Sequence, residues 1–401
     1  IEEGREKLEI VGALAQRMVK KAGLPMKVIL SYDRREALKD ADFVTTQMRI
    51  GRLPARVLDE RIPLSHGMIG QETNGAGGMF KAFRTIPVIL DIVKDMQELC
   101  PNAWMINFTN PAGMVTEAVL RYTDFKKVIG LCNVPVNMVA GIANILGVEE
   151  HRVTMQLQGV NHHIFATDVF LDGMSVMDEV VERYANVKPE DVLAMKNFIS
   201  LPYSPAFIRG LHAIPCPYHN YYFFTKEQLE EEQEQFAKGN VRGEVVSRVE
   251  EELFELYKDE QLDVKPKQLE MRGGAKYSDA ACNLIASIYT DKRDIQYVDV
   301  QNNGCISDLP DESAVEVACM ITADGPKPLA TGEMKPTISG TIHMIKAFER
   351  MVVEAAVTGN RDLAVTALNM NPLCPSDHLA NIVVDELIEA HKEYLPQFRG
   401  K

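Results

Sequence analysis

Two short motifs contain residue types that can bind a transition metal. Cys132 follows the apolar run VIGL in the motif GLCNVP, and His162 stands thirty positions further along in GVNHH. A lone cysteine in such a run is most often a small buried hydrophobe. Beside the first turn of a helix, however, the helix N-terminus is expected to lower the pKa of the thiol. A thiolate and an imidazole together would leave coordination positions open for substrate oxygens, which suits catalysis better than structure.

A tyrosine-rich and an arginine-rich stretch supply further candidates. Residues 216–224 read CPYHNYYFF. Aromatic clusters usually form core, but a tyrosine beside a cation can act as a base, since the positive field stabilises the phenolate. Residues 49–61 read RIGRLPARVLDER and contain four arginines. We expect most of them on the surface, with one or two at the mouth of a crevice to bind a phosphate.

The first part of the chain predicts alternating helices and strands. Its strand patterns are apolar runs without alternation, which is typical of a parallel sheet covered on both faces by helices. The predicted strands are 40–47, 103–108 and 126–131. The predicted helices are 5–21, 82–99, 113–122 and 136–147. The pattern predicts a doubly wound, Rossmann-like α/β domain of the lactate/malate dehydrogenase type over residues 1–150.

Polar residues follow each predicted strand of this domain. Gln47 ends the first, Asn107 and Asn110 end the second in NFTNP, and Cys132 with Asn133 ends the third. In doubly wound sheets, ligands bind outside the carboxyl ends of the strands. Asn-Pro is also a common turn sequence, so each end taken singly is more often structural. Two such turns after consecutive strands favour a functional crevice.

The second part of the chain, residues 151–401, has a mixed pattern. Residues 151–173 predict paired strands, and further strands are expected at 295–300 and 314–321. Helices are expected at 244–259, 277–291, 337–358 and 376–394. We expect an α+β domain that contributes to the substrate and metal site and to oligomerisation.

Composition excludes several classes of protein. The net charge of the 401 residues is −14 with both signs interspersed, which argues against nucleic acid as the main partner. No apolar run approaches the length of a membrane span. Seven scattered cysteines without a CxxC motif indicate free thiols in a reducing compartment. We expect a cytoplasmic protein with a small-molecule substrate.

Seven segments in order across nearly the whole chain resemble glycoside hydrolase family 4. They are IPLSHGMIGQETNGAGG (62–78), INFTNPAG (106–113), IGLCNVP (129–135), GVNHHIF (159–165), PYHNYYF (217–223), RGGAKYS (272–278) and NNGCISDLP (302–310). The resemblance is strongest to the branch acting on 6-phospho-β-glucosides, since relatives acting on α-linkages usually have aspartate at the position of Asn133. It implies hydrolysis of substrates such as 6-phosphocellobiose to glucose 6-phosphate. It also implies a homodimer or homotetramer.

The mechanism that the resemblance implies differs from that of most glycosidases, which use two carboxylates. NAD oxidises the sugar 3-hydroxyl, a base removes the C2 proton, the aglycone is eliminated, water adds, and NADH reduces C3. A divalent metal, usually Mn2+, assists the proton removal. The metal ligands implied are Cys132 and His162, and the base implied is Tyr218.

The resemblance also implies roles in binding. Asn110 and Asn133 would hold sugar hydroxyls, and Arg56 would bind the 6-phosphate or orient the sugar. Arg242 is a second candidate for the phosphate, and Glu72 of the QET motif belongs to the site without a specified role. Gln47 and Asn107 are expected to contact the NAD cofactor.

Family members open with a strand and a glycine-rich turn that binds pyrophosphate. Here the sequence begins in a helical pattern, and we expect that strand and turn to lie outside the sequence given. Two alternatives stay open. A malate- or lactate-type dehydrogenase would need a histidine–aspartate pair and no metal, and a non-catalytic nucleotide or sugar-phosphate sensor would show no turnover.

Overall fold

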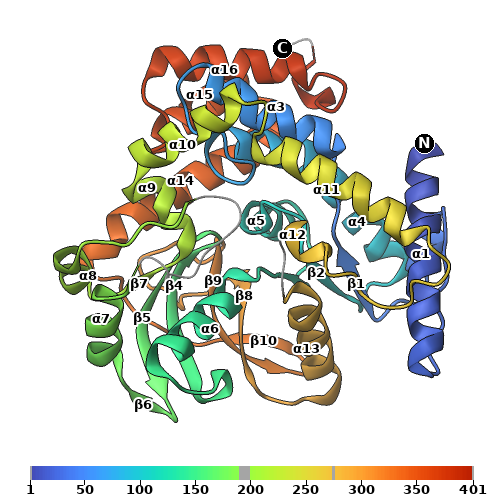
Figure 1. Cartoon of the computed structure of the whole chain (residues 1–401), viewed down its shortest axis with the longest axis horizontal. Helices are drawn as coiled ribbons and strands as arrows, with labels where there is room; N and C mark the ends of the chain where they lie inside the picture. Colours follow the sequence, from blue (N-terminus) through green and yellow to red (C-terminus); the bar gives the residue numbers. More distant parts are fainter. Residues whose placement is uncertain (1, 189–198, 273–275, 400–401) are drawn as a thin grey trace.

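A six-stranded sheet forms the centre of the computed structural model, which describes residues 2–188, 199–272 and 276–399 (Figure 1). The strand order is β1-β2-β3-β8-β9-β10. Strands β1 to β3 are parallel, and β8 to β10 are antiparallel to their neighbours. The bounds are β1 Phe43–Thr46, β2 Trp104–Asn107, β3 Val128–Gly130, β8 Ile295–Gln301, β9 Ala314–Thr322 and β10 Gly325–Pro328.

Both faces of the sheet are buried at β2 and β3, as the unbroken apolar runs predict, whereas Thr45 in the outer strand β1 is exposed. Successive residues of a strand point to opposite faces. In β2, Met105 packs with α4 (Gly75–Leu99) and α5 (Ala112–Tyr122), whereas Ile106 packs with α13 (Tyr277–Thr290). The predicted fold class, a doubly wound α/β sheet with an additional α+β part, is confirmed.

A second, antiparallel sheet contains β4 Val153–Val160, β5 His163–Leu171, β6 Met174–Ser175 and β7 Ile214–Pro215. Strands β4 and β5 form the hairpin that the sequence predicts, and only two residues, Asn161 and His162, connect them. Strands β8 to β10, from the second half of the chain, complete the first sheet. The division into domains at residue 150 stays a prediction.

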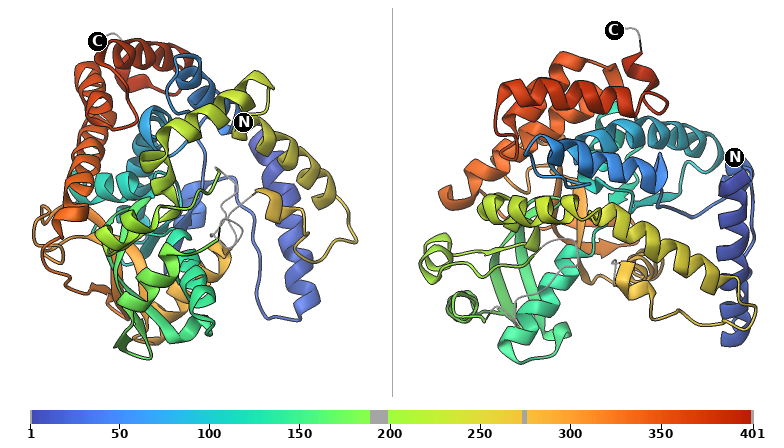
Figure 2. Two further views of the ribbon diagram at one scale, coloured as in Figure 1. Left: turned by 60° about the vertical axis from the view of Figure 1, so that its left-hand side comes forward. Right: turned by 45° about the horizontal axis from the view of Figure 1, so that its top comes forward.

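The remaining helices surround these sheets. Helices α15 and α16 lie at one end of the molecule, and α1 lies beside α11 in all views (Figures 1 and 2). The longer ones are α1 Glu2–Ala22, α3 Arg52–Ser65, α6 Val134–Leu146, α7 Met177–Ala185, α8 Pro205–Leu211, α10 Thr225–Ala237, α11 Arg242–Tyr257, α14 Pro336–Thr358, α15 Arg361–Met370 and α16 Asp377–Ala390. The short ones are α2 Arg34–Leu38, η1 Glu150–Arg152, η3 Pro217–His219, α9 Asn220–Phe223, α12 Leu269–Arg272 and η4 Pro396–Phe398.

Helix α4 begins seven residues before the start that the sequence predicts, so Pro87 lies in its interior. Glycine weakens helices, yet the segment GAGG forms the first turn of this one. The glycines are required by close packing. A Cβ on Gly77 would lie 2.3 Å from the Gln71 carbonyl oxygen, and one on Gly78 would lie 2.4 Å from the Thr73 carbonyl carbon. The first turn of α4 is thereby held directly against the QET motif.

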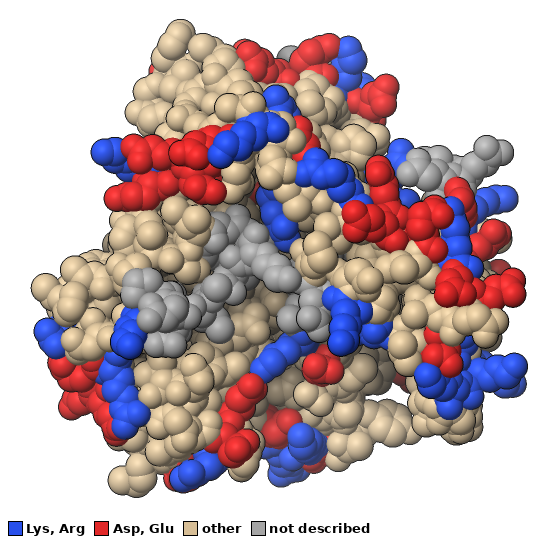
Figure 3. All heavy atoms as spheres, viewed as in Figure 1, with Lys and Arg blue, Asp and Glu red and all other residues tan. Residues whose placement is uncertain are grey.

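Charges of both signs are mixed over the face shown in Figure 3, in agreement with the interspersed sequence pattern. All seven cysteines are free thiols, as predicted. Among the described residues, no helix combines the length and the apolar character needed to cross a bilayer.

A buried ion pair joins the helices above the sheet. The two terminal guanidinium nitrogens of Arg84 in α4 donate to Asp59 in α3, at 2.8 and 2.5 Å. His391 Nε2, after α16, lies 2.9 Å from Asp59 Oδ1. Burial alone would raise the pKa of Asp59, but Arg84 and His391 outweigh it and lower that pKa. The pair therefore stabilises the fold above about pH 4, and the contribution is lost as pH falls through the lowered pKa.

Replacing Arg84 by methionine leaves the Asp59 charge buried without its main partner. We expect the free energy of unfolding to fall by about 3–5 kcal/mol at pH 7. Denaturant unfolding measures the loss. Arg293→Met is the matched control, because its ion pair with Asp291 is exposed and should contribute little. An equal loss in both variants would contradict the structural role of the Asp59–Arg84 pair.

Candidate active site

The structure brings the predicted polar strand ends to one edge of the sheet. Strands β1, β2 and β3 are parallel neighbours, so the residues that follow them lie side by side. Cys132 follows β3 directly and is buried, with a relative exposure of 1%. The backbone N–H of Val134, at the start of α6, donates to its sulfur. Cys132 therefore sits at the predicted crevice.

His162 reaches the same point from the second sheet. It occupies the turn between β4 and β5, where its φ of 63° is left-handed. Its Nε2 lies 3.5 Å from the Cys132 sulfur. A sulfur and a nitrogen that bind one metal at about 2.3 and 2.1 Å with angles of 90–110° lie about 3.1–3.6 Å apart. The Cys132–His162 pair therefore fits a divalent metal without rearrangement.

Without a metal, the imidazole of His162 and the thiol of Cys132 are both uncharged. Burial, together with the charge of Lys81, lowers the pKa of His162 to about 3, so the imidazole is neutral and has a lone pair to donate. Burial raises the pKa of Cys132 well above its usual value, and Glu316 adds to this effect. The sequence-based expectation of a lowered thiol pKa is wrong, because burial outweighs the Val134 N–H. A bound metal would have to displace the thiol proton.

Tyr218 lies directly on this pair. Its ring stacks on the His162 ring, with centroids 4.0 Å apart and an angle of 6° between the planes. It belongs to η3, which follows the short strand β7, and it is 5% exposed. The stacking holds a phenol within reach of whatever the Cys132–His162 pair binds. The aromatic segment 216–224 is thus both core and site.

His163 has a different environment from His162. Its ring packs against Phe165, His219 and Tyr222, and burial lowers its pKa to about 3. Within the described residues its ring nitrogens have no hydrogen-bond partner. The first histidine after GVN, and not the second, therefore faces the thiol.

The two asparagines predicted to bind sugar lie beside the pair. Asn133, 6% exposed, follows Cys132 and has its Oδ1 3.9 Å from the sulfur. Asn110 precedes Pro111 through a cis peptide bond, and its side chain hydrogen-bonds to Tyr277. Its Oδ1 also accepts from the Ala112 N–H at 3.3 Å. Their contact with a substrate stays a prediction.

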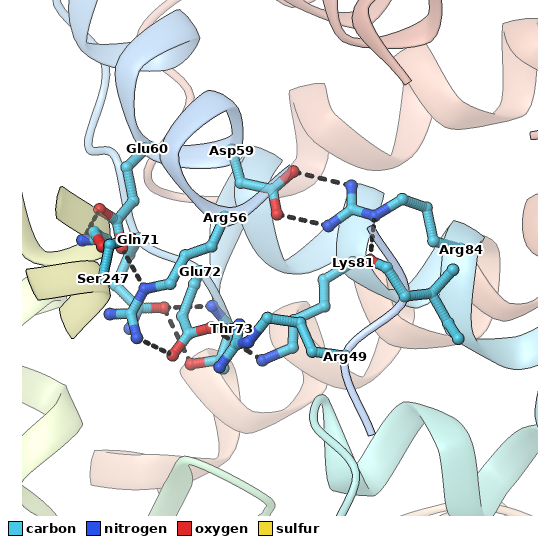
Figure 4. A network of polar contacts seen from close by, with 12 residues as sticks. Arg49, Arg56, Asp59, Glu60, Gln71, Glu72, Thr73, Lys81, Arg84 and Ser247 are labelled. Atoms are coloured by element: carbon cyan, nitrogen blue, oxygen red, sulfur yellow. Dashed lines mark hydrogen bonds and ion pairs between the residues drawn. The ribbon is translucent and has the colours of Figure 1, made fainter. Parts of the chain in front are cut away.

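A cluster of buried charges borders this site (Figure 4). Glu72 forms ion pairs with Arg49, with Arg56 at 3.0 Å and with Lys81 at 2.9 Å. Burial alone would raise the pKa of Glu72, but the three cations hold it well below its usual value. Arg56 also donates to Glu60 at 2.7 Å. Three basic side chains thus face two carboxylates, and burial together with Arg49 lowers the pKa of Lys81 to about 7.

Arg56 and Arg242 line the same pocket, together with Glu60, Gln71, Glu72 and Tyr221. Arg242 is the first residue of α11 and donates to the Met271 carbonyl oxygen at 3.2 Å. Arg56 is also close enough to Tyr218 for the two side chains to interact electrostatically. The two arginines predicted to bind phosphate are thus neighbours at one end of the site.

The two residues predicted to contact NAD differ in their surroundings. Gln47 is exposed after β1. Asn107 is fully buried, accepts from Thr46 Oγ1 at 2.8 Å and donates to the Thr109 carbonyl oxygen at 3.1 Å. Its amide therefore shapes the turn after β2, and a cofactor contact of either residue stays a prediction.

Two side chains of the site were missed by the sequence interpretation. Lys81 stands directly before the predicted helix 82–99, and no local sequence feature indicated that its side chain is buried. Asn161 stands in the motif GVNHH, but the sequence analysis assigned a role only to the histidine that follows it. Residues 273–275 of the motif RGGAKYS lie outside the described residues. Among the described residues, no group of three or more acidic, histidine or cysteine side chains forms a metal site, so the pair supplies two ligands.

The fold and site define a doubly wound α/β protein with a buried cysteine–histidine pair at the carboxyl ends of its parallel strands. The family 4 glycosyl hydrolase model matches residues 1–148, and the model of the C-terminal domain of that family matches residues 157–374. The chain belongs to family 4 of the glycosyl hydrolases.

The relatives that the chain matches share most of its length. It is 58% identical to the probable 6-phospho-beta-glucosidase of Bacillus subtilis (strain 168), covering 100% of this chain and 90% of that protein. It is 51% identical to the 6-phospho-beta-glucosidase of Escherichia coli (strain K12), covering 99% and 89%. The structure of the 6-phospho-beta glucosidase from Thermotoga maritima with manganese, NAD+ and glucose-6-phosphate is similar, with a TM-score of 0.85, 32% identity and coverage of 97% and 90%.

Proposed function

We propose that the chain hydrolyses 6-phospho-β-glucosides to glucose 6-phosphate, with NAD and a divalent metal, Mn2+ in the first instance. The observation that carries the proposal is the Cys132–His162 pair with Tyr218 stacked on it. Family membership and the two relatives named as 6-phospho-β-glucosidases support the substrate. The related structure with manganese, NAD+ and glucose-6-phosphate supports the cofactors.

The residues divide the work by their positions. When bound, the nicotinamide would exchange a hydride with the sugar C3, and the metal would polarise sugar oxygens. Cys132 and His162 hold the metal. Tyr218, stacked on His162, accepts the C2 proton. Asn110 and Asn133 orient the hydroxyls of the sugar.

The charged cluster is the proposed phosphate end of the site. Arg56 and Arg242 line one pocket, and the guanidinium groups of arginine suit phosphate because they can donate two parallel hydrogen bonds to its oxygens. Arg56 is oriented by Glu60 and Glu72, so its guanidinium is held in place before substrate binds. A dehydrogenase of the malate or lactate type is not favoured, because the histidine at this sheet edge faces a thiol and not a carboxylate.

The asparagine at position 133 leads us to expect a preference for β-linked over α-linked substrates. The neutral amide has no proton to donate near pH 7, so it cannot act as an acid toward a leaving group, whereas it can hydrogen-bond hydroxyls. We expect 6-phosphocellobiose to be cleaved and 6-phosphomaltose to be a poor substrate, in the presence of NAD+, Mn2+ and a thiol reductant. Release of glucose 6-phosphate measures both.

The unphosphorylated disaccharides are the matched controls for the phosphate. We expect neither cellobiose nor maltose to be cleaved. A clear preference for the maltose compound would refute the β assignment. Cleavage of the unphosphorylated sugars alone would refute phosphate binding by Arg56. No turnover of any phosphorylated substrate would favour the sensor alternative.

A further inference from the structure

Glu316 in β9 lies directly beneath the turn that carries His162. Its side chain is fully buried. It accepts a hydrogen bond from the backbone N–H of His162, and its Oε1 accepts another from Asn161 Nδ2 at 3.4 Å. Both donors belong to the two-residue turn between β4 and β5. One carboxyl group therefore contacts both residues of the turn.

The turn needs such support. His162 has a φ of 63°, a left-handed conformation that is unfavourable for a residue with a Cβ. Such a conformation persists where surrounding contacts hold it. Glu316 supplies two of these contacts, one to the strained residue itself.

Asn161 extends the contact to the other predicted metal ligand. Its side chain hydrogen-bonds to the Cys132 thiol as well as to Glu316. Gly113 in α5 leaves room for Asn161, because an added Cβ there would lie 2.9 Å from the Asn161 Cβ. Glu316, Asn161 and Cys132 thus form one connected path beside His162.

The strand register explains why Glu316 can do this. Gly130 in β3 pairs with Asp299 in β8, and Asp299 pairs with Glu316 in β9. Gly130, Asp299 and Glu316 therefore lie side by side on three neighbouring strands of the first sheet. Gly130 stands two residues before Cys132. His162 comes from the second sheet. Glu316 belongs to the sheet of one ligand and contacts the turn of the other.

We propose that Glu316 is a positioning residue that sets His162 at metal-binding distance from Cys132, with Asn161 as the link between the two ligands. The proposal rests on the proposed metal site. Groups that orient metal ligands typically change metal affinity about 10–100-fold when they are removed. Neither Glu316 nor Asn161 contacts the metal in this proposal. Replacing either of them should therefore weaken metal binding even when no substrate is present.

The test compares Glu316→Leu, which removes both acceptors at similar volume, with Glu316→Gln, which keeps an acceptor oxygen. The probe is Mn2+ alone, and the electron paramagnetic resonance signal of free Mn2+ gives the dissociation constant. We expect Glu316→Leu to bind Mn2+ about 10–100-fold more weakly, and Glu316→Gln to stay close to the unchanged chain. Equal affinity of all three, or an equal loss in both variants, would overturn the proposal.

Two further measurements separate this proposal from the others. If Glu316→Leu does not fold, Asn161→Ala removes the linking amide, and unchanged Mn2+ affinity in that variant would overturn the proposal.

If the unchanged chain binds no Mn2+, the proposed metal site itself fails. Glu316 is then tested by the metal-free crystal structure of a folded variant. We expect the separation of His162 Nε2 and Cys132 Sγ to increase from 3.5 Å, and an unchanged separation would refute the role.

Discussion

Replacing Cys132 by serine is expected to weaken Mn2+ binding severely and to reduce turnover by about 10³-fold or more. A metal supplies several kcal/mol of transition-state charge stabilisation, and each ~1.4 kcal/mol is tenfold in rate. Serine is nearly isosteric with cysteine, but its hydroxyl does not become the soft anionic ligand that a thiol becomes on binding a metal. His162 alone would then hold the ion.

Titration with Mn2+ and the rate on 6-phosphocellobiose measure the two effects. Cys100→Ser is the matched control, because Cys100 is also buried but lies at the end of α4, away from the strand ends. We expect that control to retain both Mn2+ affinity and turnover. Full metal content and activity in Cys132→Ser would refute the ligand assignment.

The sheet and the place of the site follow from local sequence. Apolar runs without alternation predicted β1, β2 and β3, and the polar residues after each run predicted where they converge. This prediction succeeds because strand burial and the edge at which parallel strands end are determined by neighbouring residues. The pairing of β8 with β3 joins residues that are far apart in the sequence, so no local sequence pattern could predict it.

The charged cluster shows what a local pattern leaves out. The arginines of residues 49–61 were expected mostly on the surface, with one or two at a crevice, but the pattern did not predict that Arg56 is 5% exposed and paired with both Glu60 and Glu72. Glu72 lies outside α3, so the pairing depends on tertiary structure. Likewise the pKa of Cys132 depends on burial and on Glu316, 184 positions away in sequence, and not on the adjacent helix start alone. Glu316 itself carries no local mark of function.

Replacing Tyr218 by phenylalanine is expected to lower turnover by about 10²–10⁴-fold, the usual contribution of a general base. The change removes one hydroxyl and leaves the ring that stacks on His162 at 4.0 Å. Folding and Mn2+ affinity should therefore stay unchanged while the rate falls. Tyr222→Phe is the matched control, because Tyr222 packs against His163 and not against His162; we expect it to retain activity.

The isotope content of the product tests the same assignment independently of the rate. If Tyr218 accepts the C2 proton and exchanges it with solvent, glucose 6-phosphate formed in D2O should carry deuterium at C2. The 5% exposure of Tyr218 leaves a small opening for that exchange. Because the aglycone leaves only after the proton is removed, Tyr218→Phe should slow deuterium incorporation and product release together. A product without deuterium, combined with full activity of Tyr218→Phe, would refute both the base and the elimination route.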